Sequence, residues 1–116
     1  GFCWGGGASF AYALDQPGLN AAVAYYGTSP AEAADYDRVN APVLGLYGGD
    51  DERVNSTIPR AEAAMASGGK SYEPIIYEGA GHGFLRAQEA RDGANKRAAE
   101  QAWPRTVAFF REHLRN

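Results

Sequence analysis

The chain has 116 residues, which suits one domain, and its 45% hydrophobic and 22% charged residues are ordinary for a globular protein. Its 11 basic and 14 acidic residues give a net charge of −3 without a basic block, so we expect no nucleic acid as a partner. No apolar run approaches the ~20 residues of a membrane helix and no signal-peptide pattern opens the chain, so we expect no membrane partner either.

The first half of the chain alternates between a helix and short apolar strands. Ala8–Leu14 follows a glycine-rich turn and predicts a short helix, which ends at the Pro-Gly pair 17–18. Leu19–Tyr26 contains a first apolar strand, Pro30–Asn40 predicts a loop with a helical turn, and Pro42–Tyr47 predicts a second strand. Continuous apolar strands of this kind are typical of a parallel sheet that is covered on both faces.

The second half continues the alternation. Thr57–Ala66 predicts a helix, and Tyr72–Tyr77 predicts a third strand. Because Pro74 cannot donate a ladder hydrogen bond, this strand should lie at or near a sheet edge. Ala94–Leu114 predicts a long helix with a kink or a restart at Pro104. Its core face is predicted from apolar residues at helical spacing, namely Trp103, Val107, Phe110 and Leu114. This order of elements predicts an α/β fold with a mostly parallel sheet and flanking helices.

The pentapeptide Gly1-Phe2-Cys3-Trp4-Gly5 fits the pattern of a nucleophile elbow, in which a nucleophile lies on a strained turn between a strand and a helix. The two flanking glycines are expected because strand and helix pack closely there. The N-terminus of the following helix would favour the thiolate of Cys3, and the amide of Trp4 would stabilise an oxyanion. The alternative is a glycine-rich turn that holds a buried, unreactive thiol.

Two further polar groups follow the second and third strands. Asp50 and Asp51 come directly after Gly48-Gly49, where a carboxylate could orient a histidine, although an Asx turn or a helix cap would also explain them. His82 lies in the glycine-rich loop 79–83, where a plain surface histidine is the alternative. The catalytic interpretation of His82 gains support because a nucleophile and an acid stand at equivalent strand ends. These residues alone leave open which aspartate is the acid.

One cysteine and two histidines offer too few ligands for a Cys-rich metal site. We therefore expect no metal. Because Cys3 cannot form an internal disulfide, its free thiol favours a cytoplasmic location.

Three motifs together resemble the dienelactone hydrolase family of α/β-hydrolases. They are Gly1-Phe2-Cys3-Trp4-Gly5-Gly6, the frame Gly48-x-x-Asp51-x-x-Val54, and Gly79-Ala80-Gly81-His82-Gly83-Phe84, and they follow the family's chain order of nucleophile, acid and histidine. A cysteine in place of the commoner serine is itself a mark of that family. The resemblance identifies Asp51 as the acid, and it implies that Arg86 binds a substrate carboxylate.

The resemblance implies a partial α/β-hydrolase fold. Residues 1–116 would be the C-terminal part of a single domain, from the nucleophile elbow to the last helix, without the family's first strands and second oxyanion amide. About three strands are hard to stabilise alone at this size. We therefore expect either a fragment of a longer polypeptide or a second chain that completes the sheet.

The activity that the resemblance implies is hydrolysis of a small-molecule ester or lactone. Cys3, Asp51 and His82 would form the catalytic triad, with a thioester intermediate. Two other interpretations remain open: a non-catalytic fragment or homologue that keeps the fold without the activity, and a peptidase or acyltransferase on the same fold.

Overall fold

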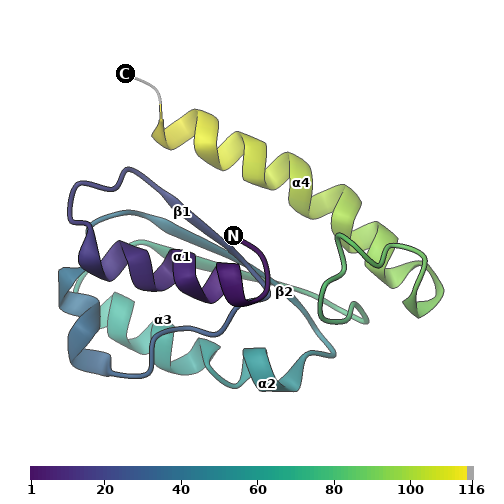
Figure 1. The fold of residues 1–116 in the computed structure, drawn as a ribbon, viewed down its shortest axis with the longest axis horizontal. Coiled ribbons are helices and arrows are strands. Elements are labelled where there is room, and N and C mark those ends of the chain that lie inside the picture. The colour runs from purple at the N-terminus through teal and green to yellow at the C-terminus, as the bar shows by residue number, and fades with distance from the viewer. Residues whose placement is uncertain (115–116) are drawn as a thin grey trace.

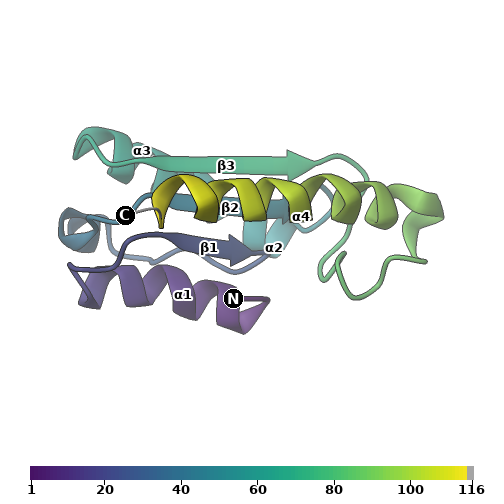
Figure 2. The same ribbon diagram turned by 90° about the horizontal axis from the view of Figure 1, so that it is seen from above.

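A parallel sheet of three strands, in the order β1-β2-β3, forms the centre of the structure, a computed structural model that describes residues 1–114 (Figures 1 and 2). The strands are β1 (Ala22–Tyr25), β2 (Val43–Gly48) and β3 (Tyr72–Tyr77). The α-helices are α1 (Trp4–Asp15), α2 (Glu52–Asn55), α3 (Ile58–Ser67) and α4 (Ala94–His113), and two short 3₁₀ helices are η1 (Ala33–Arg38) and η2 (Arg91–Gly93). The predicted α/β class, with a parallel sheet and flanking helices, is confirmed.

Helices cover both faces of the sheet (Figure 1). Successive strand residues point to opposite faces, so β1 and β2 contribute to two separate hydrophobic cores. One core joins α1, η1 and α3 to the sheet through residues that include Phe10, Tyr36, Val43 and Met65. The other joins α4 to the sheet through residues that include Val23, Leu44, Leu46 and Phe109. Both strands are buried along their whole length, as their continuous apolar runs predict.

Residues 1–3 extend the sheet beyond β1. The N-terminal amino group donates to the carbonyl of Val23 at 3.0 Å, the amide of Tyr25 donates to Gly1, and the amide of Cys3 donates back to Tyr25. Phe2 forms a parallel bridge with Tyr25. These residues therefore occupy the position of a further parallel strand that leads into α1.

β3 lies at the opposite edge of the sheet, as Pro74 predicts. Its residues are only partly buried, and Ile76 is exposed. In the part of the chain that the structure describes, no helix combines the length and the apolar character that a membrane span requires.

α1 begins four residues earlier than the predicted Ala8–Leu14, directly after Cys3. The glycines that suggested a turn lie inside the helix, because the first turn of α1 packs against the end of β1. A Cβ on Gly6 would come within 2.5 Å of the carbonyl oxygen of Tyr25, and a Cβ on Gly27 would come within 2.2 Å of the amide of Gly7. These glycines permit close packing of helix and strand; they do not break the helix.

The predicted core face of α4 is wrong for Trp103 and Leu114, whereas Phe110 is partly buried against the core beneath the helix. Trp103 is 53% exposed and Leu114 is 50% exposed, whereas the buried face is formed mainly by small residues, namely Ala94, Asn95, Ala98, Ala99, Ala102, Thr106 and Phe109. Alanines let the helix backbone approach the sheet, and the hydroxyl of Thr106 lies 2.6 Å from that of Tyr25. A prediction from helical spacing alone favours the larger apolar residues as the buried face, whereas the smaller residues of α4 are the ones that pack against the sheet.

α4 also runs through Pro104 without the predicted restart. Pro104 is exposed, so the hydrogen bond that proline cannot make is lost on the outer side of the helix. Four apolar residues lie at the margin of the buried face, with two of them exposed and two half-buried, and we call them the α4 stripe: Trp103, Val107, Phe110 and Leu114.

Candidate active site

Cys3 occupies a strained turn between the strand-like residues 1–3 and α1. Its φ of 53° and ψ of −123° lie where L-residues are rarely found, and such a conformation costs roughly 1–3 kcal/mol. Its side chain is partly exposed, at the N-terminus of α1. The amides of Gly6 and Gly7 donate to the carbonyl of Cys3, whereas the amide of Trp4 is the first of α1 and has no intrahelical acceptor. The turn has the local geometry that the elbow pattern predicts.

The two flanking glycines of this turn differ in their surroundings. A Cβ on Gly1 would lie 2.0 Å from the carbonyl oxygen of Gly5, so close packing does require glycine at position 1. A Cβ on Gly5 would meet nothing within 4 Å among the described residues. The packing reason given for both glycines therefore holds for Gly1 and is wrong for Gly5 within this chain.

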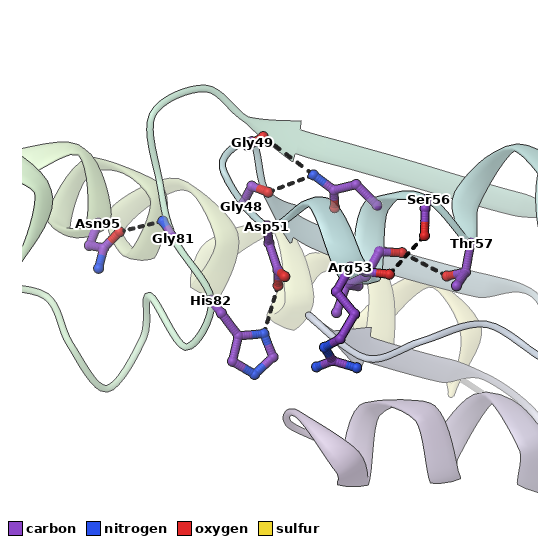
Figure 3. A network of polar contacts seen from close by, with 11 residues as sticks. Gly48, Gly49, Asp51, Arg53, Ser56, Thr57, Gly81, His82 and Asn95 are labelled. Carbon is purple, nitrogen blue, oxygen red and sulfur yellow. Dashed lines mark hydrogen bonds and ion pairs between the residues drawn. The ribbon is translucent and has the colours of Figure 1, made fainter.

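His82 and Asp51 are joined by a short hydrogen bond. The Nδ1 atom of His82 lies 2.6 Å from Oδ2 of Asp51 (Figure 3). The Asp51 side chain is only 7% exposed, whereas that of His82 is 37% exposed. A carboxylate accepts hydrogen bonds, so Nδ1 carries the proton and Nε2 is left as the basic nitrogen. The expected contact between Asp51 and the histidine ring is present.

Asp50 has a different partner. Its carboxylate accepts a hydrogen bond of 2.8 Å from the guanidinium of Arg91, and both side chains are about half exposed. The amide of Asp50 donates to the carbonyl of Ala80, which ties the loop after β2 to the loop that carries His82. Asp50 therefore braces the two loops, while its neighbour faces the histidine.

Cys3 and His82 line one cavity of about 710 Å³ at the carboxyl ends of the strands. This is where open parallel sheets commonly bind ligands. Its walls come from the outer face of α1, the loop after β1, and the side chains of Arg53 and His82. The residues that line it are Cys3, Trp4, Gly7, Ala8, Ala11, Tyr12, Asp15, Tyr26, Gly27, Thr28, Ser29, Pro30, Arg53 and His82. Asp51 lies behind His82 and does not line it.

Tyr26 is a site residue that the sequence analysis missed. Its ring centroid is 5.3 Å from that of His82, in an edge-to-face arrangement, and its φ is 38°. Burial, followed by the negative charge of a Cys3 thiolate, raises the pKa of Tyr26 to about 12. The hydroxyl therefore stays neutral near physiological pH. The Tyr-Tyr-Gly ending of β1 is the sequence signal that could have drawn attention to it.

Asn95, at the start of α4, holds the His82 loop at both ends. Its Oδ1 accepts a hydrogen bond of 2.8 Å from the amide of Gly81 (Figure 3). Its Nδ2 donates at 2.8 Å to the carbonyl of Ala87. Asn95 is 2% exposed. Apolar spacing does not reveal Asn95, because Asn95 is a polar residue within the alanine-rich face of α4.

Replacing Asn95 by alanine should loosen the His82 loop. The change leaves the buried amide of Gly81 without a partner, which costs about 1–3 kcal/mol. We expect a comparable fall in the free energy of unfolding and faster hydrogen exchange at Gly81. Thr106→Val is the matched control, because Thr106 is a buried, hydrogen-bonded residue of the same helix face far from this loop. Equal exchange rates at Gly81 in both variants would contradict the prediction.

The arginines near the site differ in placement. Arg86, the predicted carboxylate ligand, is exposed and is not part of the cavity lining. Its positive charge lies close enough to Tyr26 to oppose, in part, the rise in the pKa of that hydroxyl. Arg53, which the sequence analysis did not consider, does line the cavity.

Known proteins resemble this chain over nearly its whole length. The family model described as "Dienelactone hydrolase family" matches residues 1–114. A curated relative, the "Putative carboxymethylenebutenolidase" of Saccharolobus solfataricus, is 36% identical over 111 residues, which are 96% of this chain and 42% of that protein.

Solved structures extend the comparison. The crystal structure of a "Putative Dienelactone Hydrolase" from Klebsiella pneumoniae superposes with a TM-score of 0.81 at 33% identity, over 95% of this chain and 49% of that one. An acylaminoacyl peptidase from Pyrococcus horikoshii has a TM-score of 0.79 at 15% identity, over 100% of this chain and 24% of that one, and so shares the fold alone. The expected partial α/β-hydrolase fold is confirmed. The chain spans about half the length of the relatives it matches, or less.

Proposed function

Because the chain belongs to the dienelactone hydrolase family, we propose that it carries the catalytic residues of a hydrolase that cleaves ester or lactone bonds of small molecules. Cys3 is the proposed nucleophile, His82 the general base and acid, and Asp51 the residue that orients the imidazole. The amide of Trp4 is proposed as one oxyanion donor. No step of this reaction calls for a metal or an organic cofactor.

In the proposed reaction, His82 takes the proton of the Cys3 thiol, and the sulfur forms a bond to the carbonyl carbon of the substrate. The tetrahedral intermediate collapses, the carbon–oxygen bond of the ester breaks, and the leaving alcohol takes the proton from His82. A thioester on Cys3 remains. Water then gives a proton to His82 and attacks the thioester carbon. The carbon–sulfur bond breaks, the acid is released, and the thiol is restored.

The observation that carries this proposal is the 2.6 Å bond between His82 and Asp51 beside a cavity that also exposes Cys3 in a strained turn. A surface histidine with an ordinary role has no need of a buried carboxylate partner. A turn that only holds a thiol has no need of a conformation costing roughly 1–3 kcal/mol. Together these features support catalysis over a purely structural role.

Trapping of the thioester tests the proposal. The protein is mixed with p-nitrophenyl acetate, quenched in acid and digested, and the peptide containing Cys3 is examined by mass spectrometry. We expect an acetyl group on Cys3, the only thiol of the chain, and a burst of p-nitrophenol equal to the amount of protein. Absence of both the adduct and the turnover in a folded sample would favour the non-catalytic interpretation.

We propose that Arg86 binds the carboxylate of an extended substrate, as the family resemblance implies. Arg86 lies outside the cavity lining, so a carboxylate that reaches it must belong to a substrate that extends past Tyr26. Arg86→Ala should raise KM for a lactone bearing a carboxylate by about tenfold, since an exposed ion pair is partly screened by water. The KM for neutral p-nitrophenyl acetate should stay unchanged. An unchanged ratio of the two kcat/KM values would remove Arg86 from the substrate site.

We also propose that residues 1–116 form the C-terminal part of a single domain whose open side is covered by further polypeptide. Trp103 and Leu114 of the α4 stripe are exposed, and the half-buried Phe110 joins the stripe to a second hollow that continues to Tyr12 on α1. Residues 1–3 lie along the adjacent sheet edge. Relatives about twice as long as this chain support a covering segment of similar size.

The source of the covering segment is either the same polypeptide or a second chain. The intact mass of the purified protein, measured in denaturing and in native conditions, separates the two: one longer chain, or a complex that dissociates. A monomeric 116-residue protein that does not bind a dye specific for exposed apolar surface would contradict the proposal.

A further inference from the structure

We propose that Arg53 forms an anion-binding subsite within the cavity that holds Cys3 and His82. The subsite would take a carboxylate or another small anion that lies close to the reacting carbon. This inference deepens the proposed hydrolase function and rests on it, since it assigns a preference for anionic substrates to the same cavity. It is distinct from the role proposed for Arg86, which lies outside the cavity lining.

The position of Arg53 follows from the loop that supplies the acid. Arg53 stands in α2, two residues after Asp51, and its side chain lines the cavity. In Figure 3 the side chains of Arg53 and His82 extend toward the same side, where α1 begins. Because Cys3, His82 and Arg53 line the same cavity, we infer that a ligand on Cys3 can reach both the imidazole and the guanidinium.

The backbone under Arg53 is held at several points. The neighbouring Val54 is fully buried. Nδ2 of Asn55 donates at 2.8 Å to the carbonyl of Gly48 at the end of β2. The hydroxyl of Thr57 donates at 2.7 Å to the carbonyl of Val54 and accepts at 3.0 Å from the amide of Ser29. These hydrogen bonds fix the backbone next to Arg53 and tie it to the loop that contains Ser29, so the guanidinium extends from a fixed backbone position.

The charges around Arg53 leave its guanidinium available. Among residues 1–114, no carboxylate oxygen lies within 4.0 Å of it, whereas Arg38, Arg91 and Arg105 each pair with an acidic side chain. Asp15 is the acidic residue of the cavity lining, but it stands at the far end of α1 and its carboxylate faces Arg38 at 3.8 Å.

The N-terminus of α1 adds partial positive charge beside Cys3. We infer that the guanidinium of Arg53 adds a full positive charge to the cavity on whose wall this helix terminus lies. A guanidinium offers paired N–H donors that match a carboxylate or a phosphate. Because Arg53 is itself exposed in this chain, we expect its effect to be about tenfold in rate or affinity.

Alkylation of Cys3 tests the subsite without requiring ester hydrolysis. Iodoacetate and iodoacetamide are similar in size, and in both the thiolate sulfur displaces iodide from the same carbon, but only iodoacetate is an anion. The ratio of their rate constants on Cys3 is compared with the ratio on free glutathione. Dividing by the neutral reagent cancels changes in thiolate population between variants, so the ratio reports the local charge.

Five proteins are compared: the unchanged protein, Arg53→Met, Arg53→Lys, Arg86→Met, and Arg60→Met as the matched control. Arg60 is an exposed arginine of α3 outside the cavity lining. We expect Arg53→Met to lower the iodoacetate-to-iodoacetamide ratio about tenfold, Arg53→Lys to retain most of it, and Arg60→Met to leave it unchanged. Circular dichroism of each variant checks that the fold is intact.

The subsite is overturned if Arg53→Met leaves the ratio unchanged, or if Arg60→Met lowers it equally through a general loss of charge. A large fall in Arg86→Met with none in Arg53→Met would also overturn it, by assigning the anion to the His82 loop. Failure of the proposed hydrolase function is recognised separately, because ester turnover would then be absent while the alkylation ratio still depended on Arg53.

Discussion

Cys3→Ala is expected to reduce ester turnover by a factor on the order of 10⁴ or more, because removal of a nucleophile from a working triad leaves only the contributions of binding and oxyanion stabilisation. Alanine keeps the Cβ of cysteine, so the backbone strain at this position, where φ is 53°, should be the same in the variant. The folded state should therefore keep its stability. The measurement is kcat/KM for p-nitrophenyl acetate, together with the thermal unfolding midpoint.

Cys3→Ser provides the comparison variant. It keeps an oxygen nucleophile at the same position but one that is far less ionised than a thiol, so we expect low, non-zero turnover that iodoacetamide no longer inhibits. Retention of full activity in Cys3→Ala with an unchanged unfolding midpoint would show that another group is the nucleophile. The proposed thioester would then be wrong.

Local chemical patterns in the sequence predicted the strained turn at Cys3 and the edge position of the third strand. The elbow motif predicted a sharp turn at Cys3, and the structure has one; the proline in Tyr72–Tyr77 predicted an edge strand, and β3 is one. Each of these features follows from the covalent properties of one or a few residues. Such properties act regardless of what packs nearby, which explains why the sequence sufficed.

Features that depend on distant partners were missed or misjudged. The face of α4 predicted to be buried was largely incorrect because the helix packs on the sheet through small residues such as Ala98 and Ala102. The sequence of a helix does not indicate which surface the helix packs against. Asn95 and Tyr26 became visible only through contacts with the His82 loop. Arg53 was passed over because the acid motif drew attention to Asp51 alone. In each case tertiary contact, and not local propensity, gave the residue its place.

The choice between the two neighbouring aspartates gives a sharp test of the site. Asp51→Asn should lower kcat by about 10³–10⁴-fold, whereas Asp50→Asn should change it less than threefold. Asp51 is buried and holds Nδ1 of His82 at 2.6 Å. The asparagine side chain can accept a hydrogen bond from Nδ1 only when its carbonyl oxygen faces the ring. When its NH₂ group faces the ring instead, Nδ1 must accept, the proton moves to Nε2, and His82 can no longer act as a base through that nitrogen. Asp50 pairs with Arg91 at the surface, where an ion pair is worth about 0–1 kcal/mol.

Histidine NMR distinguishes this explanation from a loss of structure. The chain has two histidines, and His113 lies at the end of α4, away from the cavity, so it serves as an internal reference. In Asp51→Asn, the ring nitrogen shifts of His82 should report a changed tautomer or protonation state while those of His113 stay constant. In Asp50→Asn, both sets should stay constant. Equal losses of activity in the two variants, with unchanged His82 shifts in both, would mean that the loop as a whole matters and that Asp51 does not orient the imidazole.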